Sequence, residues 1–374
     1  MADELGRVEP YKIDLSPEEE KRANNILNNN LIVSLHDHIF IAPKDSAEIF
    51  DYNREGRSFT AYEGLSASPM DAVFENFMDG TCTITSKMGW KWSDVVYDVG
   101  MRMSDWAHQN LITRCECLQD IKSARQERRV AVIPCLESST MIENEVDRLD
   151  ILYGLGIRSM GIVYSEANSL GSGLKEQRDG GLTKFGQRAV ERMNKLGIAI
   201  DVSHAGNITS LDTIRASEKP IFITHSGARA LWDSARLKPD EVLLALAENG
   251  GVIGIEAAPH TTITENNPEH SLESFMEHFE YCVDLLGIDH VSFGPDTLYG
   301  DHVGLHEAFA DHLSIKAAHG QREFPKVDYV KGLENPTEAF PNIVKWLVKH
   351  DYSDSEIDKV LGGNAMRVLE EAWW

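Results

Sequence analysis

The sequence predicts an α/β fold of the closed (β/α)8 type, a TIM barrel. Three observations carry this prediction: short apolar runs rich in Val and Ile recur along the chain, helical patterns separate them, and eight such runs are present. Strands that are buried on both faces of a parallel sheet have this nearly continuous apolar character. Eight strands that alternate with helices in one chain give the number that a closed barrel needs.

The eight predicted strands follow one another at intervals along the chain. They occupy residues 31–35, 81–86, 129–136, 158–164, 198–203, 220–225, 251–257 and 290–296. Helices are predicted at 140–154, 183–196, 207–217, 240–248 and 271–287. A doubly wound open sheet is the alternative fold. No GxGxxG sequence follows the first run, which removes the usual support for that alternative.

An N-terminal arm and helix at 1–30 are predicted to precede a single barrel domain at 31–374. Ser16, Pro17 and Glu19 are typical of a helix that begins with a capping box. Two long polar loops, 39–68 and 297–335, interrupt the alternation of strands and helices. Both would lie at the C-terminal face of the barrel, where loops of this length usually act as lids or binding loops.

The composition narrows the class of partner. The 374 residues carry a net charge of −24, and a surface that acidic repels nucleic acids and anionic lipid surfaces. The N-terminus lacks the basic and apolar regions of a secretory signal, and no apolar run is long enough to cross a bilayer. Five scattered cysteines do not suggest a disulfide framework. We therefore expect a cytoplasmic protein that acts on a small molecule.

Residues of metal-ligand type stand at the ends of five predicted strands. They are His36, His38, Glu137, His204, His225 and Asp296. Because barrel active sites lie at the C-terminal ends of the strands, these side chains are expected to converge on one rim. His36 and His38 point to the same side of an extended chain, whereas Asp37 points away.

The ligand types predict the metal. Imidazole and carboxylate groups suit zinc and similar ions, and a carboxylate such as Glu137 can bridge two of them. The set therefore predicts two divalent ions, with Zn²⁺ as the expected metal. A single histidine at a strand end is more often a hydrogen-bonded structural residue, but a full set at five strand ends favours a metal site. His302 and His306, in the second long loop, have no assigned role.

From about Leu31 onward, the chain resembles the membrane dipeptidase (renal dipeptidase-like, M19) family of the amidohydrolase superfamily. The resemblance is thinner in 39–127 and 297–335. It is carried by the segments IAIDVSHAGNITSLDTI, PIFITHSGARAL, HVSFGPD and LGGNAMRVLEE.

The resemblance implies roles for individual residues. Glu137 matches the bridging glutamate, His204 and His225 match the ligands of the second metal, and Asp296 matches the aspartate of the last strand. Arg236, eleven residues after His225, matches an arginine that binds the substrate carboxylate. The resemblance also implies a homodimer.

Two departures from the family pattern concern the site. His38 stands where the family usually has an aspartate, and Tyr164 stands where the family has a histidine that contacts the scissile carbonyl. The first departure removes a negative charge from the ligand set. Together they favour an amide or acyl substrate other than an ordinary dipeptide.

The resulting hypothesis is hydrolysis of an amide bond in a small, carboxylate-bearing dipeptide or dipeptide-like substrate. Asp296, Glu137 and Tyr164 are the predicted catalytic residues, and Tyr164 and Arg236 are predicted to bind the substrate. One alternative is hydrolysis of a non-peptide amide, lactam or ester. A metal-dependent C–C lyase or decarboxylase would mostly use one ion, whereas a bridging Glu137 indicates two. The last alternative is a non-catalytic binding module on the same fold. That alternative predicts that metal ligands have been lost, and all six are present in the sequence.

Overall fold

The computed structural model describes residues 1–54, 59–77, 91–259, 261–309 and 326–373. Its strands all pair in parallel within one sheet. Along the sheet they are β1 (Val33–Asp37), β2 (Ala72–Asn76), β4 (Val130–Leu136), β5 (Ser159–Gly161), β6 (Ala199–Asp201), β7 (Phe222–Ser226), β8 (Val252–Ile255) and β9 (Val291–Phe293). The short strand β3 (Ile112–Arg114) pairs with β4 outside this order.

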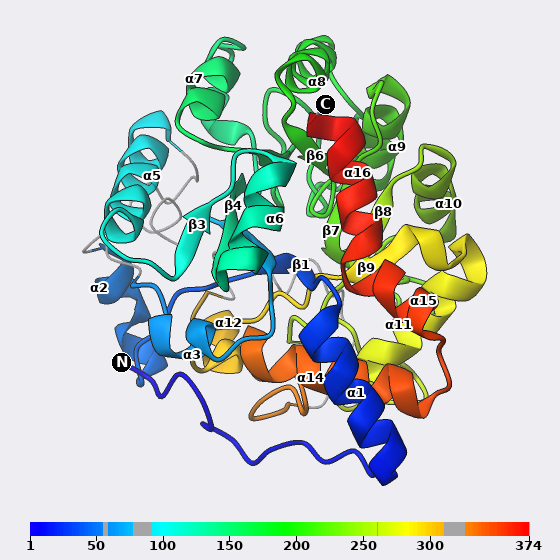
Figure 1. Cartoon of the computed structure of the whole chain (residues 1–374). Coiled ribbons are helices and arrows are strands. Elements are labelled where there is room, and N and C mark those ends of the chain that lie inside the picture. The colour runs from blue at the N-terminus through cyan, green and yellow to red at the C-terminus, as the bar shows by residue number, and fades with distance from the viewer. Residues whose placement is uncertain (55–58, 78–90, 260, 310–325, 374) are drawn as a thin grey trace.

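The chain beyond β9 returns to the end of β1. The Asp296 amide donates to the His36 carbonyl over 2.9 Å, and the His38 amide donates to the Thr297 carbonyl over 2.8 Å. The Asp37 carboxylate accepts from both the amide and the hydroxyl of Thr297, each at 2.8 Å. These contacts bring the two ends of the sheet together, so the described strands form a nearly closed barrel and the predicted fold class is confirmed (Figure 1).

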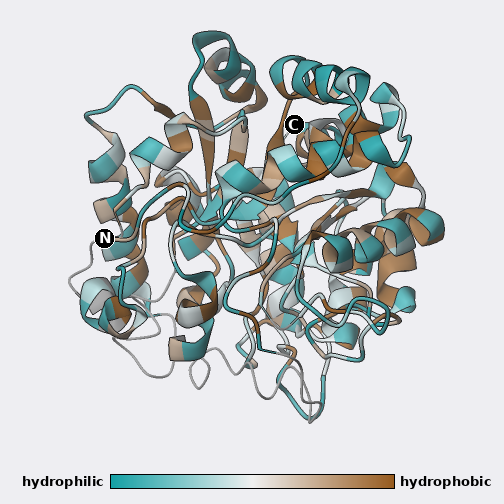
Figure 2. Cartoon of the chain, turned by 90° about the horizontal axis from the view of Figure 1, so that it is seen from below, coloured by the Kyte–Doolittle hydropathy of each residue, from teal (hydrophilic) through white to brown (hydrophobic). Residues whose placement is uncertain are grey.

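Helices surround the barrel (Figure 1). The longer ones are α1 (Pro17–Asn29), α5 (Trp92–Trp106), α6 (Leu118–Glu127), α8 (Lys184–Leu196), α9 (Asn207–Ala216), α10 (Asp240–Glu248), α11 (Leu272–Leu286), α14 (Pro336–Lys349) and α16 (Asn364–Trp373). Shorter ones are α2 (Ile49–Arg54), α3 (Tyr62–Ser66), α7 (Arg148–Gly154), α12 (His302–Phe309) and α15 (Asp354–Asp358). Their hydrophobic faces turn towards the strands, where the core lies (Figure 2).

The predicted start of the first helix is confirmed. The Ser16 side chain accepts from the Glu19 amide, and the Glu19 carboxylate accepts from the Ser16 amide. Two helical turns, α2 and α3, lie within the predicted loop 39–68, and α12 lies within 297–335. These long segments are therefore partly helical.

The second strand of the barrel was not predicted. The structure places it at Ala72–Asn76, whereas the predicted run 81–86 lies outside the described residues. This strand was not recognised in the sequence because it ends in two polar residues, Glu75 and Asn76. Both side chains are buried and make hydrogen bonds inside the fold: Glu75 accepts from the Ile39 amide, and Asn76 contacts His36. Hydrogen-bonded polar groups of this kind are compatible with a buried strand.

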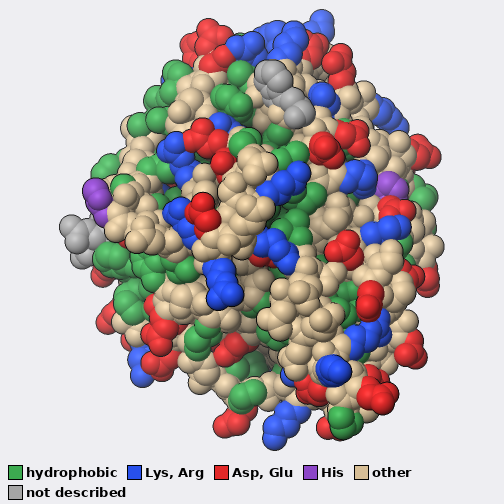
Figure 3. All heavy atoms as spheres, viewed as in Figure 1, with side chains coloured by type: hydrophobic (Ala, Val, Ile, Leu, Met, Phe, Trp, Pro, Cys, Tyr) green, Lys and Arg blue, Asp and Glu red, His purple; other side chains and the backbone are tan. Residues whose placement is uncertain are grey.

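The surface is charged and mixed. On the face in Figure 3, acidic and basic side chains are interspersed with hydrophobic ones over many elements. The net charge of −24 is therefore not gathered into one patch on this face. Among the helices that the structure describes, none is both long and apolar enough to cross a membrane.

Candidate metal centre

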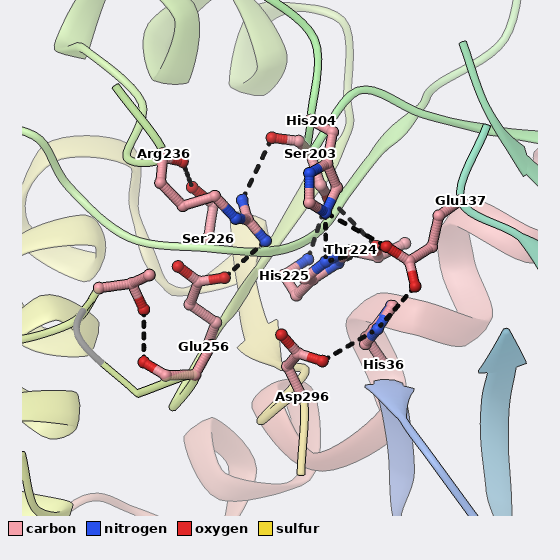
Figure 4. A network of polar contacts seen from close by, with 12 residues as sticks. His36, Glu137, Ser203, His204, Thr224, His225, Ser226, Arg236, Glu256 and Asp296 are labelled. Atoms are coloured by element: carbon pink, nitrogen blue, oxygen red, sulfur yellow. Dashed lines mark hydrogen bonds and ion pairs between the residues drawn. The ribbon is translucent and has the colours of Figure 1, made fainter. Parts of the chain in front are cut away.

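The structure brings all six predicted ligands together at the C-terminal rim of the barrel. His36 lies in β1 and His225 in β7, and the others lie just after β1, β4, β6 and β9. Five of them are labelled in Figure 4, where they face a common space: His36, Glu137, His204, His225 and Asp296. His38 joins them through Asp296.

Asp296 lies between the two histidines of β1. Its Oδ1 is 3.2 Å from Nε2 of His36 and 3.1 Å from Nε2 of His38. The His36 and His38 rings stand nearly perpendicular, with centroids 5.0 Å apart. One oxygen of Asp296 therefore lies within 3.2 Å of an imidazole nitrogen of each of these two histidines.

Glu137 faces the ligands on both sides. Its Oε1 is 3.8 Å from Nε2 of His36. Its Oε2 is 3.2 Å from Nε2 of His204 and 3.9 Å from Nε2 of His225. Three groups of potential ligand atoms, each within 4.8 Å, result: His36, His38 and Glu137; His36, His225 and Asp296; and Glu137, His204 and His225. Glu137 shares two of these groups, as a bridging carboxylate would.

Burial sets the protonation of the ligands. It lowers the pKa of His36 and lowers those of His204 and His225 well below the ordinary value, with the positive charge of Arg236 adding to the effect on the last two. Burial by itself would raise the pKa of Asp296. The electrostatic interaction and hydrogen bond with the His36 ring, and the hydrogen bond with His38, outweigh it and hold that pKa well below the usual range. Neutral imidazoles and an ionised carboxylate are the forms that bind metal ions.

The outward nitrogens of two histidines are also engaged. Nδ1 of His36 lies 2.8 Å from Nδ2 of Asn76, and Nδ1 of His225 lies 2.8 Å from the Thr224 hydroxyl. Such contacts fix the ring orientation and leave Nε2 towards the site. Neither partner, Asn76 or Thr224, was predicted from the sequence. For Asn76 the sequence offered no signal, because its strand was not predicted.

The backbone brings the two carboxylates into place. Asp296 adopts a left-handed conformation with φ 59°, which few non-glycine residues other than Asn and Asp adopt readily. At the end of β5, Gly161 packs against the Glu137 backbone: an added Cβ would lie 1.9 Å from the Glu137 carbonyl oxygen. Only a glycine therefore permits this approach of β5 to the Glu137 backbone.

Tyr164 lies against one of the ligands. Its ring stacks on that of His204, with centroids 4.0 Å apart and an interplanar angle of 20°. Burial raises the pKa of Tyr164 well above its ordinary value, and the carboxylates of Glu137 and Asp296 raise it further. The hydroxyl is therefore protonated at neutral pH and is available only as a neutral donor.

Arg236 lies beside the ligands but is already paired. Its Nη2 is 2.6 Å from Oε2 of Glu256, and its Nη1 donates to the Ser203 carbonyl over 3.2 Å (Figure 4). Glu256 follows β8 and is completely buried. Glu256 was not predicted as a site residue, although it is the only charged residue in the predicted strand 251–257.

The two histidines without an assigned role lie on α12. The rings of His302 and His306 make an edge-on contact with centroids 4.5 Å apart. Among the described residues, neither belongs to a group of potential metal ligands.

Comparison with known proteins identifies the family. The model of the family described as membrane dipeptidase (peptidase family M19) matches residues 20–313, which is most of the chain. The chain belongs to the membrane dipeptidase family. The predicted resemblance is confirmed, and so is the class of enzyme, a metal-dependent hydrolase.

Relatives in the membrane dipeptidase family have modest sequence identity to this chain. An "uncharacterized protein in pqqA 5'region" of Klebsiella pneumoniae is 27% identical over 267 residues, which cover 69% of this chain and 88% of that protein. "Dipeptidase aclJ" of Aspergillus oryzae is 28% identical over 243 residues, which cover 64% of this chain and 51% of that protein. Human "Dipeptidase 3" is 23% identical over 262 residues, covering 68% and 48%. The chain thus spans about half the length of these two dipeptidases.

Solved structures share the fold. An amidohydrolase from Pseudomonas aeruginosa superposes with a TM-score of 0.77 at 23% identity, covering 94% of this chain and 99% of that one. A metallo peptidase from Rhodobacter sphaeroides, liganded with a phosphinate mimic of the dipeptide L-Ala-D-Ala, has a TM-score of 0.70 at 20% identity, covering 92% and 100%. At these identities the similarity supports the barrel fold.

Proposed function

We propose that this chain is a two-metal hydrolase that cleaves an amide bond in a small dipeptide-like substrate. The observation that carries the proposal is the position of Glu137, whose two oxygens face different histidines of the rim. The chain's membership in the membrane dipeptidase family supports the same reaction.

The donor set fits divalent metal ions. Nε2 of His36 is buried and, among the residues that the structure describes, its polar neighbours at the site are the carboxylates of Asp296 and Glu137. We infer that His36, His38 and Asp296 hold one ion, that His204 and His225 hold the other, and that Glu137 reaches both. Imidazole and carboxylate ligands favour Zn²⁺. Such ions, when bound, supply a water molecule with a pKa of about 7 and polarise the substrate carbonyl.

The protein residues then move the protons. The ionised Asp296 carboxylate accepts a proton from the attacking water and delivers it to the leaving nitrogen. The Tyr164 hydroxyl, which burial keeps protonated, donates a hydrogen bond to the oxygen that becomes negative. Glu137 holds the group around His36 and the group around His204 in a fixed position relative to each other.

A non-peptide amide, lactam or ester is the second candidate substrate. The supporting observation is that His38 and Tyr164, which both depart from the family pattern, lie in contact with other groups of the rim.

We also propose that the protein is a homodimer and that it lies in a reducing cytoplasm. Light scattering would test the oligomeric state, and localisation of a tagged chain would test the compartment.

Metal analysis tests the proposal most directly. Pure protein reconstituted with Zn²⁺ should bind about two ions per chain and hydrolyse some member of a panel of L,L dipeptides, L,D dipeptides and N-acyl amino acids. Glu137→Gln should lose most activity and at least one ion. Glu145→Gln, an exposed change of the same kind nearby, should behave as the parent does. An active enzyme that holds only one ion would contradict the two-metal proposal.

A further inference from the structure

The guanidinium of Arg236 is enclosed by protein acceptors. One nitrogen, Nη2, is 2.6 Å from the Glu256 carboxylate, and another, Nη1, donates to the Ser203 carbonyl. Ser203 directly precedes the candidate ligand His204, so the guanidinium lies at the edge of the metal centre. The Arg236 side chain is only 7% exposed, so the pair with Glu256 is largely shielded from solvent.

Glu256 is held opposite this guanidinium. Its amide donates to the Ser226 carbonyl over 2.9 Å, and the Ser226 hydroxyl donates to the Arg236 carbonyl over 3.1 Å. Ser226 therefore fixes the backbones of both partners beside His225. The Glu256 side chain is fully buried, so its carboxylate cannot leave the pair for solvent while the site keeps this arrangement.

A substrate carboxylate would meet two obstacles at Arg236. It would have to displace Glu256, which would leave that buried charge without its partner, a costly change. If Glu256 stayed, the substrate would place a second carboxylate beside it, and like charges at close range repel. Figure 4 shows the acidic side chains of Glu256 and Asp296 on the same side of the site.

We propose that Glu256 determines the specificity of this site: by occupying Arg236, it selects substrates whose group at this position is a neutral amide, ester or hydroxyl instead of a free carboxylate. The inference rests on the proposed amide hydrolysis and changes its expected substrate, because Arg236 alone would favour a carboxylate. A neutral group leaves the Arg236–Glu256 pair in place. An amide or a hydroxyl can also donate a hydrogen bond to the Glu256 carboxylate, whereas an ester only avoids the charge repulsion.

Paired substrates test the inference. The Zn²⁺-loaded enzyme would be assayed at pH 8 with alanyl dipeptides that carry either a free C-terminal carboxylate or a C-terminal amide. This pH lies above the pKa of about 7 to which burial raises Glu256, against the lowering effect of Arg236. The parent should have the higher kcat/KM on the amide. Glu256→Gln should shift the ratio towards the carboxylate by at least about tenfold.

Controls separate this inference from the proposed reaction. Glu269→Gln removes the same charge at an exposed position paired with Lys331, and should leave the ratio unchanged. Binding of N-acetylalanine and N-acetylalaninamide, measured by calorimetry, gives a readout that needs no turnover. If no amide is hydrolysed but the amide probe binds more tightly and Glu256→Gln reverses the order, the proposed reaction fails and the specificity inference stands.

Two results would overturn the inference. One is an unchanged carboxylate-to-amide ratio in a folded Glu256→Gln variant. The other applies even if that variant does not fold: tighter binding of N-acetylalanine than of N-acetylalaninamide by the parent protein. Either result would show that Arg236 accepts a carboxylate in the presence of Glu256.

Discussion

Asn76 on β2 places its side-chain amide 2.8 Å from Nδ1 of His36 on β1. In the structure, Nδ2 of Asn76 faces Nδ1 of His36. A metal ion at Nε2 of His36 requires the proton to be on Nδ1, so the Asn76 amide must then be turned over to present its oxygen as the acceptor. The neighbouring strand therefore determines which nitrogen of His36 is available to the site.

Replacing Asn76 should weaken metal binding without removing a ligand. We expect Asn76→Ala to lower Zn²⁺ affinity by about 10–100-fold, the usual effect of losing such a contact. Competition with a chromophoric chelator would measure it. Asn76→Asp should retain the parent affinity, because its carboxylate also accepts from Nδ1. The exposed change Asn28→Ala serves as the control, and equal affinities in all variants would refute the role.

Tyr164→Phe should reduce catalysis and leave the metals in place. The phenylalanine ring can keep the stacking on His204, whereas the hydroxyl donor is lost. We expect kcat on the best substrate to fall by about 10²–10³, the cost of one oxyanion donor. Steady-state kinetics and metal analysis of the same preparation would check both parts. A variant as active as the parent would leave Tyr164 with a packing role only.

Gly161→Ala should disturb the site through the backbone. The new Cβ would overlap the Glu137 carbonyl, so β5 must shift away from β4. We expect a loss of about 1–3 kcal/mol in the free energy of unfolding, typical of overpacking, together with weaker metal binding. Urea denaturation would measure the first. Gly154→Ala, where the added Cβ meets nothing within 4 Å, should be neutral or slightly stabilising.

His278 should make folding sensitive to acid. Burial lowers its pKa from 6.5 to about 4, while its Nδ1 accepts from the Ala228 amide and its Nε2 faces the Ile263 carbonyl. Between these pH values the unfolded chain binds a proton that the folded chain does not, so stability falls as the pH drops from 6.5 to 4. The loss attributable to His278 is on the order of 3 kcal/mol.

Comparison of the parent with His278→Asn isolates this contribution. The variant should be less stable at pH 8, because it loses packing and hydrogen bonds, but its stability should decline less between pH 6.5 and 4. Chemical denaturation at several pH values would give both quantities. Parallel pH profiles would show that another group is responsible for the acid sensitivity.

The positions of the six candidate ligands could be predicted from the sequence because each stands at or just after the end of an apolar run. A strand end is a local property, and the barrel then brings strand ends together whatever the details of packing. The strand β2 was missed for the opposite reason: Glu75 and Asn76 appear polar in the sequence, and only their buried partners show why they belong in the sheet.

The Arg236–Glu256 pair could not be predicted from spacing alone. Arg236 lies in the segment after β7 and Glu256 follows β8, so their contact depends on how that segment folds back over the rim. A sequence motif shows that an arginine is present, but it does not show which acidic side chain forms an ion pair with that arginine. The same holds for Tyr164, whose ring contact with His204 required the three-dimensional arrangement.

The contact between β9 and β1 has a consequence for how this chain can vary in evolution. Thr297 is tied to the Asp37 carboxylate through two hydrogen bonds, so the register between these distant segments is pinned at one point. Insertions in the surface segments between them leave this register intact. A single inserted or deleted residue within 291–296 would shift the alignment by one position and turn the strand side chains beyond it to the opposite face. Such a change would open the barrel and move Asp296 away from His36 and His38 in one event. We therefore expect length variation among relatives to avoid this short stretch, even where its apolar residues vary freely.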